Sequence, residues 1–277
     1  DPQLWLAAFS QVFFSLSLAF GIMVAYASLN KRETEIVGSV IWIAAGNFVV
    51  SFLSGLVVFG TLGYMALQQG VLLSEVVAGG PSLVFVVFPA AISLLPALNA
   101  LFAVIFFGML LLLAIDSAFS LLEALATTFR ERYPNVPTEK IAFVLCAVTA
   151  FVGLIFTTKA GLYYLDIVDH FVVNYGLVTI GLIEAVIIGW LWKFDSFVDF
   201  LNEHSHIKVG SLFKVAIRYV IPVFLGFLLI WNVIHELKTP YEGYPVEALI
   251  WLGVMPLLLV PIVAWGIDRL VSRPSHE

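Results

Sequence analysis

The sequence predicts an all-α membrane protein whose helices cross the bilayer several times. Hydrophobic residues make up 61% of the chain and charged residues only 12%, and the mean hydropathy is +1.04. Because a soluble domain carries about 25% charged residues, this composition argues against a soluble fold. The apolar residues also gather in runs of at least about 20 residues, the length that a helix needs to cross the hydrocarbon core.

Seven apolar runs predict seven transmembrane helices. The expected spans are residues 4–28, 37–63, 98–129, 139–157, 163–192, 213–236 and 246–271. Several are longer than one crossing requires, which permits tilt or an extension beyond the membrane. Residues 64–97 are apolar but interrupted by glycine and proline, and we expect two short surface helices there, around 66–78 and 82–95, in a position to cap a cavity.

The first span is expected to be discontinuous. Gln11, Ser15 and Ser17 recur among phenylalanines, and Gly21 follows them. In hydrocarbon an unsatisfied backbone N–H or C=O costs several kcal/mol, so a broken helix persists only where it lines a buried cavity. Secondary transporters bind substrates and ions at such breaks. The segment therefore favours transport.

The distribution of basic residues predicts the orientation. With the N-terminus outside, eleven of the thirteen Lys and Arg residues fall on the inner side and only Lys159 and Lys238 fall outside. The inner residues are Lys31, Arg32, Arg130, Arg132, Lys140, Lys193, Lys208, Lys214, Arg218, Arg269 and Arg273. By the positive-inside rule we expect an integral protein of the plasma (cytoplasmic) membrane with its C-terminus inside.

Several other classes of protein are disfavoured. The net charge of -6 and the lack of a basic cluster argue against a nucleic-acid partner. A single cysteine, Cys146, excludes a disulfide within the chain. No phosphate-binding glycine loop and no metal-spaced Cys/His cluster is present, so we expect no enzyme. The chain starts without methionine and shows no signal peptide, and we expect that an N-terminal portion is missing.

Asp116 is the strongest candidate for an ion ligand. It lies deep within the span 98–129, where a carboxylate costs at least about 2.5–3.5 kcal/mol. A bound cation would offset this cost, and the neighbouring Ser117 adds a hard oxygen ligand suited to Na⁺. The alternative is a structural polar pair between helices. Glu123, two turns later, is equally compatible with ion sensing and with packing.

Five motifs in order resemble the neurotransmitter:sodium symporter family. They are QVFFSLSLAFG (11–21), NFVVSFLSGLVVFGTLGYMA (47–66), GGPSLVFVVFPAA (79–91), FFGMLLLLAIDSAFSLLE (106–123) and LDIVDHFVVNYGLVTIGLIEAV (165–186). The resemblance runs from about residue 5 to 270. It implies the second half of a leucine-transporter-type inverted-repeat fold, with the seven spans as the family's helices six to twelve.

The resemblance also implies a domain organisation. Residues 1–192 would form the second five-helix repeat, with an extracellular lid at 64–97, and residues 193–277 would add two peripheral helices. The partners would be the lipid bilayer, a small amino acid, and the family's helices one to five, as the missing N-terminal part of the same protein.

The resemblance implies two sodium sites and a chloride site. The first sodium site falls on Ser15 and Asn47, and the second falls on the carbonyl of Leu113 with Asp116 and Ser117. The chloride site would be formed by Gln11, Ser15, Asn47 and Ser51. Chloride-independent relatives place a glutamate where Ser51 stands, so we expect chloride to bind here.

The resemblance places a small, mostly apolar substrate pocket at Phe14, Ser17, Phe20, Ser117 and Leu121. Such a pocket suits a neutral, hydrophobic amino acid. Asp169 would be the acidic residue of the outer gate and Glu131 that of the inner gate, although Glu131 alone reads as an ordinary interfacial charge. Ala19 departs from the family pattern, which usually has glycine there.

Together these features predict sodium-coupled, chloride-assisted symport of an amino acid by alternating access. A transporter of a biogenic amine or organic cation with the same fold remains an alternative. A non-transporting membrane scaffold is a further alternative, which the intact set of ion ligands argues against. A channel would need a continuous polar stripe, and the spans show only a cluster of polar residues.

Overall fold

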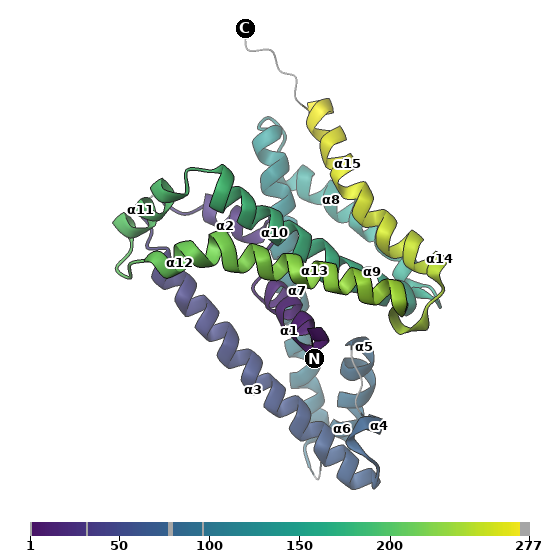
Figure 1. The fold of residues 1–277 in the computed structure, drawn as a ribbon. Helices are drawn as coiled ribbons and strands as arrows, with labels where there is room; N and C mark the ends of the chain where they lie inside the picture. Colours follow the sequence, from purple (N-terminus) through teal and green to yellow (C-terminus); the bar gives the residue numbers. More distant parts are fainter. Residues whose placement is uncertain (1, 32, 77–79, 96, 272–277) are drawn as a thin grey trace. The chain divides into compact units, whose positions relative to one another are not determined.

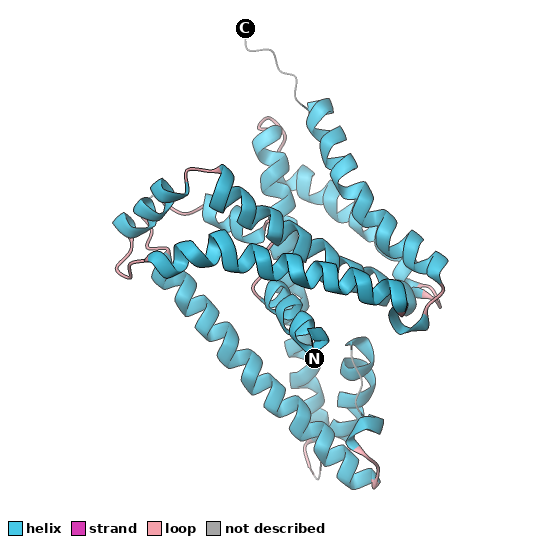
Figure 2. Ribbon diagram, viewed as in Figure 1, coloured by secondary structure: helices cyan, strands magenta, loops and turns pink. Residues whose placement is uncertain are grey.

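A computed structural model describes residues 2–31, 33–76, 80–95 and 97–271. All regular structure in these ranges is helical (Figure 2), as the sequence predicts. Two of the predicted inner cations, Arg32 and Arg273, lie outside the described residues, as do residues 77–79 and 96 of the predicted lid.

Six described helices are long and apolar enough to cross a membrane. They are Val37–Gln69, Asn99–Arg132, Thr138–Thr157, Gly161–Leu191, Ser211–Gly243 and Val246–Gly266. Each contains most of one of the last six predicted spans.

The first predicted span is a pair of helices separated by an irregular segment. α1 (Pro2–Ser15) ends within the predicted break, and α2 (Ile22–Ser28) begins after it. The backbone turns between them with positive φ at Ser17 (53°), Ala19 (63°) and Gly21 (75°). Helical φ is negative, so these residues cannot continue α1.

The segment after the second span is helical at both ends. α3 (Val37–Gln69) continues through Gln68 and Gln69, which are good helix formers, to Gly70, whose φ of 68° ends the helix. The surface helix expected at 66–78 is therefore wrong, and only the short α4 (Leu73–Val76) follows. The second surface helix is present as a continuous run of α5 (Gly80–Ser82), η1 (Leu83–Val87) and α6 (Phe88–Ser93).

The remaining chain forms long helices joined by short turns (Figure 1). Their segments are α7 (Asn99–Arg132), α8 (Thr138–Gly153), η2 (Leu154–Thr157), α9 (Gly161–Phe171), η3 (Val172–Leu177), α10 (Val178–Val186), η4 (Ile187–Leu191), α11 (Phe194–His204), α12 (Ser211–Val215), η5 (Ala216–Val220), α13 (Ile221–Lys238), η6 (Tyr241–Gly243), α14 (Val246–Ala248), η7 (Leu249–Val254) and α15 (Met255–Val271). η1, η3, η5 and η7 are π-helical turns, which insert an extra residue without ending the helix, and η4 is a π-helical turn after which the helix ends at Leu191.

No helix is predicted for residues 193–210, where the structure forms α11. Its buried residues Phe194, Val198 and Leu201 are spaced by four and three positions, which places them on one helix face. This spacing of apolar residues could have predicted α11 from the sequence.

The chain divides into two compact units, which are described separately. The first comprises Asp1–Val40 and Leu121–Glu277, and the second comprises Ile41–Ser120. In the first unit α13 packs along α10 and α1 packs along η3 (Figure 1). The rings of Phe9 and Phe224 lie 4.4 Å apart, and Phe13 lies over Gly181. Burying these aromatic rings in contact holds the short α1 against two long helices.

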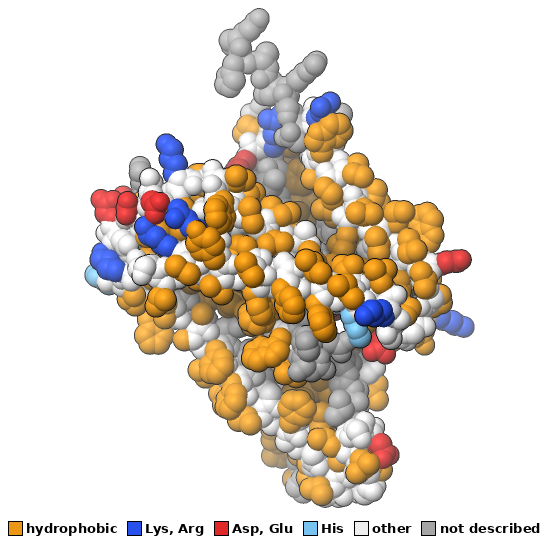
Figure 3. Space-filling model, in the orientation of Figure 1, with side chains coloured by type: hydrophobic (Ala, Val, Ile, Leu, Met, Phe, Trp, Pro, Cys, Tyr) orange, Lys and Arg blue, Asp and Glu red, His pale blue; other side chains and the backbone are white. Residues whose placement is uncertain are grey.

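Hydrophobic side chains cover much of the surface. On the face seen in Figure 3 they extend along α13, while charged groups gather toward the two ends of that helix. Charges at both ends and apolar side chains between them are the arrangement that suits a helix crossing a bilayer.

Candidate functional site

The break between α1 and α2 exposes backbone polar groups. Leu16, Ser17 and Leu18 donate their N–H groups back to the last turn of α1. Within the part of the chain that the structure describes, no backbone N–H donates to the carbonyl oxygens from Leu16 to Phe20. Such oxygens suit a metal cation or an ammonium group, because either one replaces the missing donors.

Two predicted substrate residues meet at the break. The rings of Phe14 and Phe20 lie 5.8 Å apart at an interplanar angle of 76°, which is the favourable edge-to-face geometry. Ser17 lies between them in the chain. The irregular segment at 16–21 therefore brings two partly exposed aromatic rings together next to the open carbonyls.

Two of the predicted chloride ligands share one face of α1. Gln11 and Ser15 are four residues apart on this helix, so their side chains lie one turn from each other. Ser15 Oγ donates to the carbonyl of Val12 at 3.4 Å. A hydroxyl can hold such a local bond and still accept or exchange a partner, since it has one donor and two lone pairs.

The second unit carries predicted ion ligands on two helices. Asn47 and Ser51 are one turn apart on α3. Leu113, Asp116 and Ser117 occupy one face of α7, with Asp116 midway along this 34-residue helix. Asp116 is exposed, and no described Lys or Arg forms an ion pair with it. Leu121, one turn after Ser117 on the same helix, is also exposed.

The two predicted gate carboxylates, Asp169 and Glu131, are exposed. Asp169 on α9 and Glu131 at the end of α7 form no hydrogen bond or ion pair with any described residue. Glu123 differs, because its Oε1 accepts from Arg130 Nη2 at 3.3 Å and from Thr127 Oγ1 at 3.3 Å. Glu123 therefore makes hydrogen bonds within its own helix, as the packing alternative expects.

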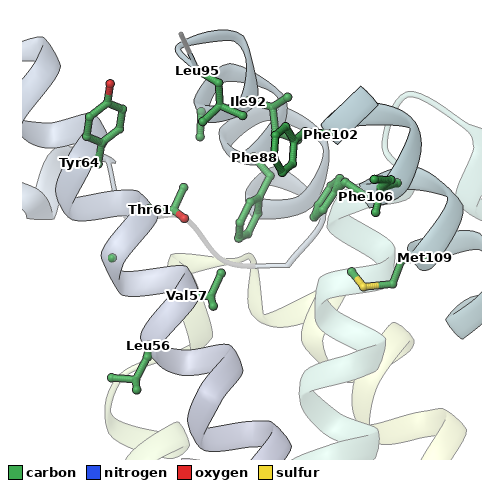
Figure 4. Close-up of a pocket in the computed structure, with 13 residues that line it drawn as sticks. Leu56, Val57, Thr61, Tyr64, Phe88, Ile92, Leu95, Phe102, Phe106 and Met109 are labelled. Atoms are coloured by element: carbon green, nitrogen blue, oxygen red, sulfur yellow. The ribbon is translucent and has the colours of Figure 1, made fainter. Parts of the chain in front are cut away.

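An apolar cavity of about 620 Å³ lies within the second unit. It is lined by α3, by the helix that ends at Ser93, and by α7, with Phe88, Phe102 and Phe106 among the side chains that face it (Figure 4). None of the predicted ion, substrate or gate residues lines it. It is therefore a feature separate from the predicted pocket.

A second polar cluster was missed by the sequence analysis. His170 Nε2 lies 3.1 Å from Glu236 Oε2, and Asp166 accepts hydrogen bonds from Tyr241 and Tyr244. Tyr244 lies outside the spans, and partial burial together with its bond to Asp166 raises its pKa to about 12. It therefore remains a hydrogen-bond donor at physiological pH.

Comparison with known proteins identifies the family of this chain. A profile described as the sodium:neurotransmitter symporter family matches residues 1–271. The chain belongs to this family. This membership confirms the resemblance that the five motifs indicate.

Individual relatives extend the comparison. The chain is 38% identical over 259 residues to an uncharacterized sodium-dependent transporter of Methanocaldococcus jannaschii, covering 93% of this chain and 52% of that protein. It is 30% identical over 300 residues to the mouse sodium- and chloride-dependent neutral and basic amino acid transporter B(0+), covering 100% of this chain and 47% of that protein. It is also 30% identical over 290 residues to the rat sodium- and chloride-dependent GABA transporter 2, with 100% and 48% covered. The chain thus spans about half the length of the curated relatives it matches.

Proposed function

We propose that this chain forms the second half of a sodium-coupled symporter for a neutral, hydrophobic amino acid. The observation that carries the proposal is Asp116, an exposed carboxylate without a described ion pair, midway along an apolar helix of 34 residues. Its desolvation in a membrane requires a compensating positive charge. A sodium ion supplies that charge and takes the hard oxygen ligands that Asp116 and Ser117 offer.

The proposal includes two sodium sites with different ligands. Asp116, Ser117 and the Leu113 carbonyl hold one ion, and Ser15 and Asn47 hold the other. Chloride binds Gln11, Ser15, Asn47 and Ser51 and balances the added positive charge. The names of the mammalian relatives, which include chloride dependence, support this assignment.

The substrate binds at the break in the first span. The open carbonyls after Ser15 receive the ammonium group, and Phe14, Ser17, Phe20, Ser117 and Leu121 surround the side chain. Asp169 closes the outer side and Glu131 the inner side, each against a cation from the part of the protein that precedes this chain. Rocking between outward- and inward-open states then carries sodium down its gradient and the amino acid with it.

The membrane arrangement follows from the same proposal. The first residues of this chain face outside and the C-terminus faces inside. Residues 1–192 form the second inverted repeat with its lid at 64–97, and residues 193–277 add the two peripheral helices.

Uptake by the full-length protein in liposomes tests the proposal. Leucine uptake is expected to require an inward sodium gradient and to fall when choline replaces sodium. Asp116→Asn is expected to abolish sodium-driven uptake, whereas the control Glu203→Gln, a cytoplasmic carboxylate on α11, is expected to retain it. Sodium-driven uptake by Asp116→Asn would refute the assignment.

Chloride and substrate identity need separate measurements. Replacing chloride with gluconate is expected to slow uptake, and an unchanged rate would remove the chloride site from the proposal. GABA is a second candidate substrate, because a GABA transporter matches the chain as well as an amino acid transporter does. Competition of unlabelled GABA with labelled leucine distinguishes the two.

A further inference from the structure

A network of partly buried hydrogen bonds joins α9 to the end of α13 and to the turn that follows it. His170 on α9 and Glu236 on α13 are 3.1 Å apart, and their side chains are only 11% and 17% exposed. The His170 ring also stacks on Tyr241, with centroids 3.7 Å apart and planes at 14°. Three elements therefore meet at one imidazole.

The hydrogen bonds assign a role to each ring nitrogen of His170. Asn174 Nδ2 donates to Nδ1 at 3.2 Å and to the backbone carbonyl of His170 at 3.1 Å. Nδ1 is therefore the acceptor, and Nε2–H donates to Glu236. Both ring nitrogens are satisfied, and this fixes the ring more strongly than either contact alone.

Glu236 is the second centre of the network. Its Oε1 accepts the backbone N–H of Tyr241 at 3.0 Å, and its Oε2 also accepts the Tyr175 hydroxyl at 3.4 Å. One carboxylate thus holds the turn after α13 and two side chains of the neighbouring helix. Hydrogen bonds to a charged group are roughly twice as strong as neutral ones.

Asp166, one helical turn before His170, adds a second contact between α9 and the segment that follows α13. Its two oxygens accept the hydroxyls of Tyr241 at 3.2 Å and Tyr244 at 2.9 Å. Asp166 and His170 are four residues apart and hence on one face of α9. Two anchors on a single face fix both the position of the helix and its rotation about its own axis.

The rotation of α9 sets the direction of Asp169. This residue directly precedes His170, so its side chain leaves the helix about 100° away from the anchored face. Asp169 is exposed, in contrast to its two anchored neighbours. The network therefore determines where an unbound carboxylate points.

We propose that His170 and Glu236 are positioning residues that aim Asp169 at the outer gate. The inference rests on the function proposed above, in which Asp169 closes the outer side. Loss of either partner releases the anchored face of α9, and the gate carboxylate then samples several directions. Substrate binding weakens as a result, while the ion ligands remain intact.

A double-mutant cycle in the full-length protein tests the transport consequence. His170→Ala and Glu236→Ala are each expected to raise the half-saturating amino acid concentration by roughly ten-fold, the equivalent of one hydrogen bond to a charged group. The double variant is expected to be no worse than either single one, because both remove the same interaction. Glu247→Ala, an exposed carboxylate nearby on α14, is the control and is expected to match the unmodified protein.

A merely structural role predicts a different pattern. It would lower the amount of folded protein and the maximal rate, with the half-saturating concentration unchanged. His170→Gln, which retains a side-chain donor, is expected to recover most of the lost affinity. Additive effects, or a change in maximal rate alone, would overturn the proposal.

A second readout does not depend on transport. Asp169→Cys, in a protein with Cys146→Ala, is labelled with a membrane-impermeant maleimide from outside. Adding His170→Ala or Glu236→Ala is expected to change the labelling rate several-fold, whereas Glu247→Ala leaves it unchanged. Equal rates in all variants would refute the positioning role, whereas lack of sodium-driven uptake with altered labelling would refute only the proposed function.

Discussion

Two helices of nearly equal length and hydropathy differ completely in their packing. The apolar window of Gly161–Leu191 is 28% buried within the structure, and that of Asn99–Arg132 is 0% buried, although their hydropathies are 2.1 and 2.4. The buried helix carries Asp166 with two tyrosine donors, while the exposed helix carries Asp116 without a described ion pair. Hydropathy therefore measures whether a helix can enter lipid, and says nothing about which face a partner covers.

Sodium binding at Asp116, on the exposed helix α7, is expected to have the largest effect on stability. If Asp116 holds the ion, sodium at a hundred times its dissociation constant stabilises the full-length protein by about 2.7 kcal/mol. Thermal unfolding in sodium and in choline measures this difference. Asp116→Asn is expected to lose the stabilisation that comes from the ion at Asp116 and to keep only that from the ion at Ser15 and Asn47, and a sodium-dependent rise as large as in the unmodified protein would contradict the assignment.

Two glycines, one in the packed core and one on the exposed helix α7, test this difference in packing. A Cβ at Gly253 would lie 2.2 Å from Phe171 Cδ2, in the core cluster of Ile167, Phe171 and Leu249, whereas a Cβ at Gly108 on α7 meets nothing within 4 Å. Gly253→Val is expected to destabilise the fold by about 1–3 kcal/mol because the core is overpacked.

The matched substitution Gly108→Val serves as the control in this chain. It is expected to change the free energy of unfolding by less than about 0.5 kcal/mol, as surface substitutions do. Chemical denaturation of both variants measures the two effects. A large effect of Gly108→Val in the full-length protein alone would show that another helix covers this face of α7.

Ala19 offers a test of the break itself. Its φ of 63° lies in the left-handed region, which costs a residue with a Cβ roughly 1–2 kcal/mol. Ala19→Gly is expected to raise the free energy of unfolding by about 1 kcal/mol, whereas Ala8→Gly within α1 is expected to lower it by about 0.5–1 kcal/mol. Destabilisation by both substitutions would show that residue 19 does not adopt this conformation.

Asp195 on α11 is expected to give the smallest effect, and one that depends on pH. Hydrogen bonds from Lys214, at 2.6 Å, and then from Arg218, at 3.2 Å, lower its pKa below the ordinary carboxyl value. A lowered pKa contributes stability above the unfolded value of about 3.9, and that contribution disappears as the pH falls through the folded value. Because the carboxylate is 63% exposed, solvent screening keeps the effect small.

Comparing Asp195→Asn with the unmodified protein across pH checks this sign. The melting temperature of the variant is expected to be slightly lower at pH 7, and the gap is expected to close below about pH 4. A gap that widens on acidification would contradict the predicted direction.

The sequence could predict the spans because length and hydropathy act locally. The break in the first span could also be predicted from the sequence. Ser15, Ser17 and Gly21 interrupt an apolar run, and an unbroken helix would gain nothing from these residues. The helix expected at 66–78 is wrong because the preceding span does not end at residue 63: Leu67, Gln68 and Gln69 are good helix formers, and α3 ends only at Gly70.

The polar network could not be predicted because its members are distant in the sequence. Sixty-six residues separate His170 from Glu236, and neither residue carries a local pattern that identifies its partner. Asp116 was easier to select because its position alone, in the middle of an apolar run, is energetically costly. The candidate ion and substrate residues stay predictions, since each of them depends on groups contributed by more than one part of the protein.

The π-helical turn η3 has a consequence for how this helix tolerates change. One extra residue within Val172–Leu177 shifts every later side chain by about 100° relative to an uninterrupted α-helix. That shift lets one continuous rod present His170 to α13 at one end and Gly181 to Phe13 beyond the turn. Deleting a single residue there would preserve composition and hydropathy, yet would turn one half of the rod away from its neighbours.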